Sequence, residues 1–145
     1  MQKLLPLMTV AVIFVTLVSC SRKPTQFRKE TYPVKGVVYV DGNPASNLQV
    51  TVHDVKGLDK EHPTLSTAMT DDKGQFAVST YAQGDGVPEG EYTATFVWGE
   101  LNLLSMQYSG DKLKGRYNDP QKSQVRFKVE KGKPVDLGKI ELTTK

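Results

Sequence analysis

Hydrophobic and polar residues alternate with a period of two along most of the chain from residue 32 onward. The clearest stretch, "EYTATFVW" at 91–98, places Tyr92, Ala94, Phe96 and Trp98 on one face and polar side chains on the other. A period of two is typical of β-strands with one buried face, whereas an amphipathic helix repeats every 3.6 residues. The pattern therefore predicts strands, and it predicts no long amphipathic helix after the N-terminal leader.

The same alternation recurs in six further stretches. These are "VKGVVYV" at 34–40, "LQVTVH" at 48–53, a weaker "TLSTAMT" at 64–70, "QFAVST" at 75–80, "QVRFKVE" at 124–130 and "VDLGKIEL" at 135–142. Turn signals such as Asp41-Gly42 separate most of them. In the last stretch, Leu137 and Ile140 fall out of step by one residue, which a bulge at Gly138 would absorb. Seven short strands predict an all-β protein with an antiparallel β-sandwich.

The N-terminus has a different pattern, in which Lys3 precedes an apolar block that ends just before Cys20, the only cysteine of the chain. This layout is that of an export signal, and the block is shorter than the roughly 20 apolar residues that span a bilayer. The stretch Leu17-Val18-Ser19-Cys20 resembles the lipobox of bacterial lipoproteins. The resemblance implies cleavage before Cys20 and fatty acyl chains, such as palmitate, on that residue. The alternative is an incidental cysteine behind an ordinary signal peptide, for which these residues are a poor cleavage site.

We therefore expect a lipoprotein signal peptide at 1–19, a lipidated cysteine and polar tether at 20–31, and one domain at 32–145. By the same resemblance, Ser21 favours the outer membrane over the inner membrane. The formal net charge of the whole chain is only +3, without a block of like charges. A nucleic acid is therefore not an expected partner of an exported chain, whereas the membrane is, through the lipid on Cys20.

Four stretches of the predicted domain resemble sequences of known proteins. "VKGVVYVDGNPASNLQVTV", "TDDKGQF" and "PEGEYTATF" resemble successive motifs of carboxypeptidase-regulatory-like domains, and "LKGRYNDPQKS" resembles a stretch of small bacterial envelope lipoproteins. The resemblance implies a transthyretin-like, Ig-type sandwich without peptidase activity. Within it, we expect Gly36 to leave room for a large side chain of the facing sheet. We also expect Asp71 or Asp72 to cap a turn at Gly74, and the Tyr92 hydroxyl to bond to nearby backbone.

Residues with the chemistry of an active site or metal site do not form a recognisable pattern. His53 and His62 lack the spacing of metal ligands, and the acidic residues lack that of a calcium loop. The serines lack the G-x-S-x-G pattern of a nucleophile. We therefore expect no enzyme, no cofactor and no metal.

The connection at 99–123 is longer than most and too apolar for simple disorder. One interpretation is a strand extension or short helix that covers a sheet edge, with Leu113 and Tyr117 packed onto it. The other is a surface for another envelope protein. The candidate interaction residues are Leu103, Tyr108, Lys112, Lys114, Arg116 and Tyr117. A carbohydrate-binding module, with Trp98 as the sugar-stacking residue, is the alternative function, although alternation groups Trp98 with the core.

Overall fold

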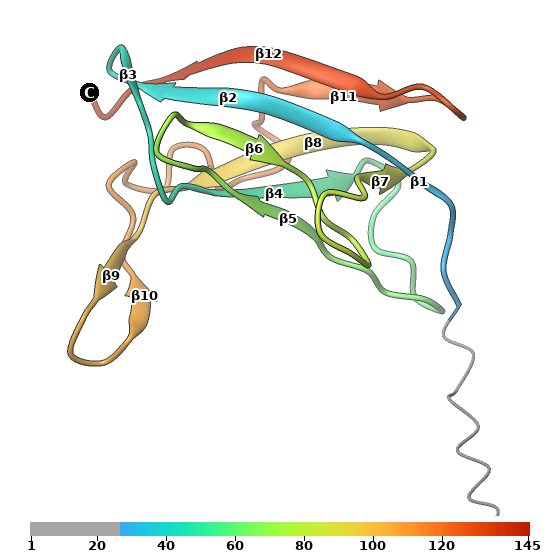
Figure 1. Cartoon of the computed structure of the whole chain (residues 1–145), viewed down its shortest axis with the longest axis horizontal. Helices are drawn as coiled ribbons and strands as arrows, with labels where there is room; N and C mark the ends of the chain where they lie inside the picture. Colours follow the sequence, from blue (N-terminus) through green and yellow to red (C-terminus); the bar gives the residue numbers. More distant parts are fainter. Residues whose placement is uncertain (1–26) are drawn as a thin grey trace, which may run out of the picture.

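The computed structural model describes residues 27–145, which fold into short strands arranged in two packed layers (Figure 1). The strands of this part of the chain are β1 (Thr31–Tyr32), β2 (Val34–Val40), β3 (Asn43–Pro44), β4 (Gln49–Asp54), β5 (Ser66–Met69), β6 (Gln75–Ala77), β7 (Val87–Pro88), β8 (Gly90–Val97), β9 (Glu100–Asn102), β10 (Gln107–Ser109), β11 (Arg126–Val129) and β12 (Val135–Leu142). The prediction of an all-β sandwich is confirmed. The predicted leader and Cys20 lie outside the described residues.

Each layer of the sandwich is built around one long strand. In the first layer the strand order is β11-β8-β4-β5, and each neighbouring pair is antiparallel. In the second layer the order is β12-β2-β3, and β6 also pairs with β2. An isolated antiparallel bridge between Thr67 and Ser79 joins the two layers along one side. Within 27–145, no helix is long and apolar enough to cross a membrane.

One strand pair departs from the predicted antiparallel arrangement, because β12 runs parallel to β2. The preceding strand, β11, belongs to the other layer, so the chain crosses between layers before β12 begins. It enters the second layer with Val135 beside Val34, at the start of β2, and both strands then run the same way. Side chains alternate with a period of two in both parallel and antiparallel strands, so the sequence pattern does not distinguish the two arrangements. The predicted bulge is confirmed, since the register shifts between Asp136 and Lys139.

The core lies between the layers and receives large apolar side chains from both. Its fully buried members of largest volume are Phe96, Leu48, Leu113, Val34, Val38, Val50, Val78, Val87 and Val129.

The hydrogen bonds predicted for the Asp71 turn and for Tyr92 are also present. Asp71 Oδ1 accepts the N–H groups of Lys73 and Gln75, and Gly74 has a φ of +74°. The Tyr92 hydroxyl donates to the Pro88 carbonyl at 2.9 Å, as predicted.

The space beside Gly36 is occupied by a different side chain from the one predicted. A Cβ atom at Gly36 would lie 2.9 Å from both Cε1 and Cζ of Phe76. Phe76 is the cross-strand partner of Gly36 on β6, in the same sheet. The expectation of a side chain from the facing sheet is therefore wrong. The missing Cβ instead lets the Phe76 ring lie over β2.

The two ends of the sandwich are structurally distinct (Figure 1). The chain enters the domain at residue 27, at one end of the long axis, and the hairpin of β9 and β10 projects from the opposite end. Because β4 and β8 run along this axis, their connecting loops gather at the two ends. We call these the entry end and the hairpin end. Both ends carry a surface depression.

Candidate functional site

The hairpin end carries a small antiparallel sheet of two strands, β9 and β10, which pair only with each other within the described residues. Asn102 closes its tip by accepting the N–H groups of Leu104 and Ser105 on its side-chain oxygen, at 2.9 and 3.2 Å. Met106 completes the turn with a positive φ of 53°. The tip therefore has a defined turn conformation held by local hydrogen bonds.

The side chains at this tip are apolar and face solvent. Leu104 is 99% exposed and Leu103 is 78% exposed, and Met106 is exposed beside them. Single exposed apolar residues are common on protein surfaces, whereas contiguous ones mark interaction sites. Three neighbouring residues on one projecting turn form such a contiguous set. We call Leu103, Leu104 and Met106 the apolar tip.

A surface groove of about 520 Å³ lies at the base of the hairpin. It is lined by Ser46, Asn47, Met69, Trp98, Gly99, Glu100, Tyr108 and Lys112. The Trp98 indole N–H donates to the Ser46 carbonyl at 3.0 Å, which fixes the orientation of the ring. The ammonium of Lys112 lies 4.7 Å from the centre of that ring and 3.2 Å from a Glu100 carboxylate oxygen. Trp98 thus packs partly on the core, as its alternation suggests, and partly lines this groove.

The structure separates the predicted interaction residues into two groups. Leu103 and Tyr108 belong to the hairpin, and Lys112 lines the same groove as Tyr108. The remaining candidates, Lys114, Arg116 and Tyr117, follow on the next loop and do not line it. Of these, Lys114 and Arg116 are exposed, whereas Tyr117 packs against the core. The tip and groove therefore contain half of the predicted set.

The loop after the hairpin belongs to the domain body. Leu113 is completely buried in the core. Asp111 holds this loop by accepting the N–H groups of Trp98 and Leu113 on Oδ1 and that of Gly115 on Oδ2, each at 2.9 Å. Asp111 was not predicted from the sequence, although the spacing of Asp111, Leu113 and Gly115 in "DKLKG" is typical of a side chain that caps its own loop. Leu104 and Met106 were not among the predicted interaction residues either.

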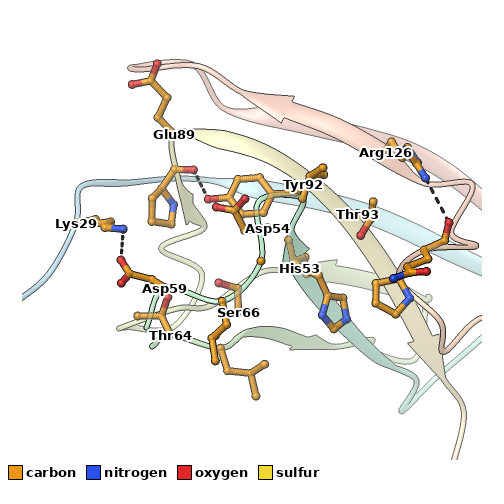
Figure 2. Close-up of a pocket in the computed structure, with 18 residues that line it drawn as sticks. Lys29, His53, Asp54, Asp59, Thr64, Ser66, Glu89, Tyr92, Thr93 and Arg126 are labelled. Atoms are coloured by element: carbon orange, nitrogen blue, oxygen red, sulfur yellow. Dashed lines mark hydrogen bonds and ion pairs between the residues drawn. The ribbon is translucent and has the colours of Figure 1, made fainter. Parts of the chain in front are cut away.

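The second depression is a cleft of about 500 Å³ at the entry end (Figure 2). It is lined by Lys29, Val52, His53, Asp54, Val55, Gly57, Leu58, Asp59, Thr64, Leu65, Ser66, Pro88, Glu89, Tyr92, Thr93, Pro120, Gln121 and Arg126. No single strand supplies this lining, because it comes from β4 and β8, from single residues of β5, β7 and β11, and from the connecting segments, chiefly the loop at 55–65. This cleft was not predicted from the sequence.

Several charged groups in the cleft already have partners in the protein. Lys29 Nζ lies 2.7 Å from Asp59 Oδ2, and this contact lowers the pKa of Asp59 to about 2. The Arg126 guanidinium donates to the Gln121 carbonyl at 3.3 Å. His53 Nε2 lies 2.8 Å from Thr95 Oγ1, and burial lowers the pKa of His53. The described residues contain no group of three His, Cys, Asp or Glu side chains placed to bind a metal ion.

Comparison with known proteins adds no family assignment. No family model matches the chain, and no curated protein sequence matches it. Three solved structures resemble part of the fold. They are a DUF3823 family protein from Parabacteroides merdae (11% identity, TM-score 0.40, 80% of this chain and 46% of that one), (S)-allantoin synthase (16%, 0.40, 80% and 42%) and a 9R-lipoxygenase from Cyanothece (15%, 0.38, 78% and 16%).

The chain spans less than half the length of each of these proteins. Likeness at this level carries no argument about activity or partners, and the functional interpretation rests on the geometry of this chain. The resemblance to carboxypeptidase-regulatory-like domains remains a prediction from the sequence motifs.

Proposed function

We propose that this protein is a lipid-anchored, non-catalytic β-sandwich of the bacterial cell envelope that binds another envelope protein through its hairpin end. The observation that carries the binding proposal is the apolar tip, which an ordered turn presents to solvent beyond the domain body. Exposure of these apolar side chains to water is unfavourable, and a bound partner would remove them from water.

The groove at the base of the hairpin supplies the polar part of the proposed contact. Glu100 and Lys112 form an exposed ion pair beside Tyr108 and Trp98. Protein interfaces commonly combine aromatic residues at the centre with a polar, solvent-accessible rim. The tip and groove together offer this combination on one end of the domain.

The membrane anchor is proposed from the lipobox at Leu17–Cys20. Each buried CH₂ group stabilises membrane attachment by about 0.8 kcal/mol, so that one myristoyl chain binds reversibly and two or more chains make a stable anchor. A diacylglycerol thioether on Cys20 would hold the domain at the membrane surface. Mass spectrometry of the mature N-terminal peptide tests this part, because a bare thiol at Cys20 contradicts it.

The binding proposal is tested by crosslinking in intact cells, followed by mass spectrometry of the captured proteins. The test variant carries Leu103→Ser, Leu104→Ser and Met106→Ser, and should lose its partner while its melting temperature stays within about 1–2 °C of the parent protein. Lys131→Ser changes an exposed residue of the turn between β11 and β12, which belongs to neither depression, and is the control. An unchanged set of crosslinked proteins in the tip variant would contradict the proposal.

Carbohydrate binding at Trp98 is the second candidate, because one side of this ring lines a surface groove. The position of Lys112 disfavours it, since the ammonium group lies over the ring face on which a sugar would stack. Glycan-array binding that is lost in a folded Trp98→Ala variant would favour the carbohydrate function over the protein-binding one.

A further inference from the structure

Exposed large hydrophobic side chains occupy only the two ends of the described domain. Five of them belong to the hairpin or its groove, namely Met69, Leu103, Leu104, Met106 and Tyr108. The other four are Phe27, Val55, Leu58 and Leu65. Val55, Leu58 and Leu65 line the entry-end cleft, and the Phe27 ring stacks on His62 of the same loop with 4.0 Å between ring centres. We call these four residues the entry patch.

The loop that carries the entry patch is held in a defined conformation. The Val55 N–H donates to the Glu91 carbonyl at 2.9 Å, and Gly57 turns the chain with a positive φ of 90°. Asp59 Oδ1 then accepts the N–H groups of Glu61 and His62, each at 3.0 Å. Leu58 lies between these fixed points and is 67% exposed. The loop therefore presents an apolar side chain at little further entropic cost.

The segment that enters the domain is itself attached to this end. The Lys29 ammonium contacts Asp59, and the Lys29 N–H donates to the Tyr81 hydroxyl at 3.2 Å. Two residues later β1 pairs with β7. The described chain therefore begins at this end of the domain, with Phe27 next to the apolar loop.

Only residues 21–26 separate Cys20 from Phe27. Because a chain spans at most about 3.6 Å per residue, Phe27 stays within about 25 Å of an anchor at Cys20. The entry patch thus remains close to the bilayer surface, whereas the hairpin end lies at the far end of the long axis (Figure 1). At such a short distance, even a weak contact is favoured by the high effective concentration that the anchor creates.

We propose that the entry patch is a membrane-docking face: Phe27, Val55, Leu58 and Leu65 insert into the interface of the bilayer that holds the anchor, which orients the hairpin away from it. This inference rests on the proposed anchor at Cys20. Charges of both signs alternate along the loop at Lys56, Asp59, Lys60 and Glu61. The contact made by the loop is therefore mainly apolar, whereas Arg28, next to Phe27, adds a salt-dependent attraction to anionic headgroups.

The test uses the mature lipoprotein reconstituted in vesicles of phosphatidylethanolamine and phosphatidylglycerol at 3:1. A nitroxide label is placed at Leu58→Cys, or at Leu104→Cys as the matched control on the hairpin. Cys20 is the only native cysteine, so lipidation leaves the introduced thiol as the sole labelling site. Collision rates of the label with oxygen, which concentrates in lipid, and with a water-soluble nickel complex are then compared by electron paramagnetic resonance.

We expect a severalfold higher ratio of oxygen to nickel collisions at Leu58 than at Leu104. Equal, water-like ratios at both positions, on protein whose Cys20 is shown by mass to be lipidated, overturn the docking face and leave the anchor in place. Dipolar broadening between Leu58 labels identifies a second copy of the chain as the occupant and also overturns it. A bare Cys20 thiol in the same preparation refutes the anchor, and the docking face with it.

Discussion

Replacing Leu113 with alanine tests whether the loop after the hairpin is part of the folded core. Leu113 is completely buried, although it lies in the long connection between β10 and β11. Leu→Ala substitutions at fully buried sites destabilise proteins by about 2.7–5 kcal/mol, because transfer free energy is lost and a cavity remains. A domain of this size has a total stability of about 5–15 kcal/mol. We therefore expect Leu113→Ala to remove a large fraction of the free energy of unfolding.

The assay is urea unfolding of a soluble form that lacks the leader and carries Cys20→Ser, with thermal melting as a second measurement. At this chain length, the expected loss corresponds to a decrease in melting temperature of roughly 10–20 °C. Leu104→Ala is the matched control, since Leu104 lies in the same connection but is almost fully exposed. Its free energy of unfolding should stay within about 0.5 kcal/mol of the parent value.

Two results would refute this reasoning. If Leu113→Ala unfolds within about 0.5 kcal/mol of the parent protein, the loop at 110–118 does not unfold together with the core. The whole 99–123 segment would then be a removable appendage. If Leu104→Ala is as destabilising as Leu113→Ala, the apolar tip has a packing role and the binding proposal loses its basis.

Three further predictions concern the body of the domain. Gly36→Ala should lower the free energy of unfolding in urea by about 1–3 kcal/mol, because its Cβ meets the Phe76 ring, and adding Phe76→Leu should recover part of the loss. Burial raises the pKa of Tyr92 from 10 to about 12. The stabilising contribution of the neutral phenol is therefore complete below pH 10 and is lost as the pH rises through 12. In Tyr92→Phe, the urea concentration at the unfolding midpoint should depend less on pH across this range. The pKa of Asp59 is instead lowered from 3.8 to about 2 by Lys29, so its contribution is complete above pH 4 and is lost as the pH falls through 2. Amide resonances of the 59–62 turn should report this transition, and Asp59→Asn should remove it.

Alternation along the sequence predicted the strands best where one face is covered by the other layer. At β8, Tyr92, Ala94 and Phe96 are buried as the period of two requires. Thr93 and Thr95 on the opposite face are buried too, which alternation does not predict. On this face the His53 ring of the neighbouring strand β4 contacts Thr95. Along the edge, the segment before β11 pairs with β8, where the Ala94 and Phe96 N–H groups donate to the Val125 and Tyr117 carbonyls. Burial by distant segments leaves no local trace in the strand itself.

The candidate site was predicted only in part for a related reason. Leu104 and Leu113 are the same residue type nine positions apart, yet one is exposed and the other is fully buried. Hydrophobicity cannot separate them, because Leu113 is buried in a core cluster whose other members lie on strands distant in the sequence. The local signal that does separate them is Asp111, whose carboxylate binds backbone N–H groups on both sides of the loop. An aspartate that precedes a leucine and a glycine at this spacing marks where the projecting hairpin ends and the packed loop begins.

The proposed anchor explains why the two exposed apolar groups are at opposite ends of the sandwich. A domain anchored at residue 20 would keep its entry end within about 25 Å of the bilayer, whether or not a partner is present. The hairpin end would then face away from the bilayer, where it is accessible to other envelope proteins. Substitution to serine at Val55, Leu58 and Leu65 should therefore change the orientation of the domain without directly removing a partner contact, whereas serine at the apolar tip should do the reverse. If both sets of substitutions removed the same crosslinked protein, partner access would depend on orientation, and docking at the entry end would then be a condition for binding at the hairpin end.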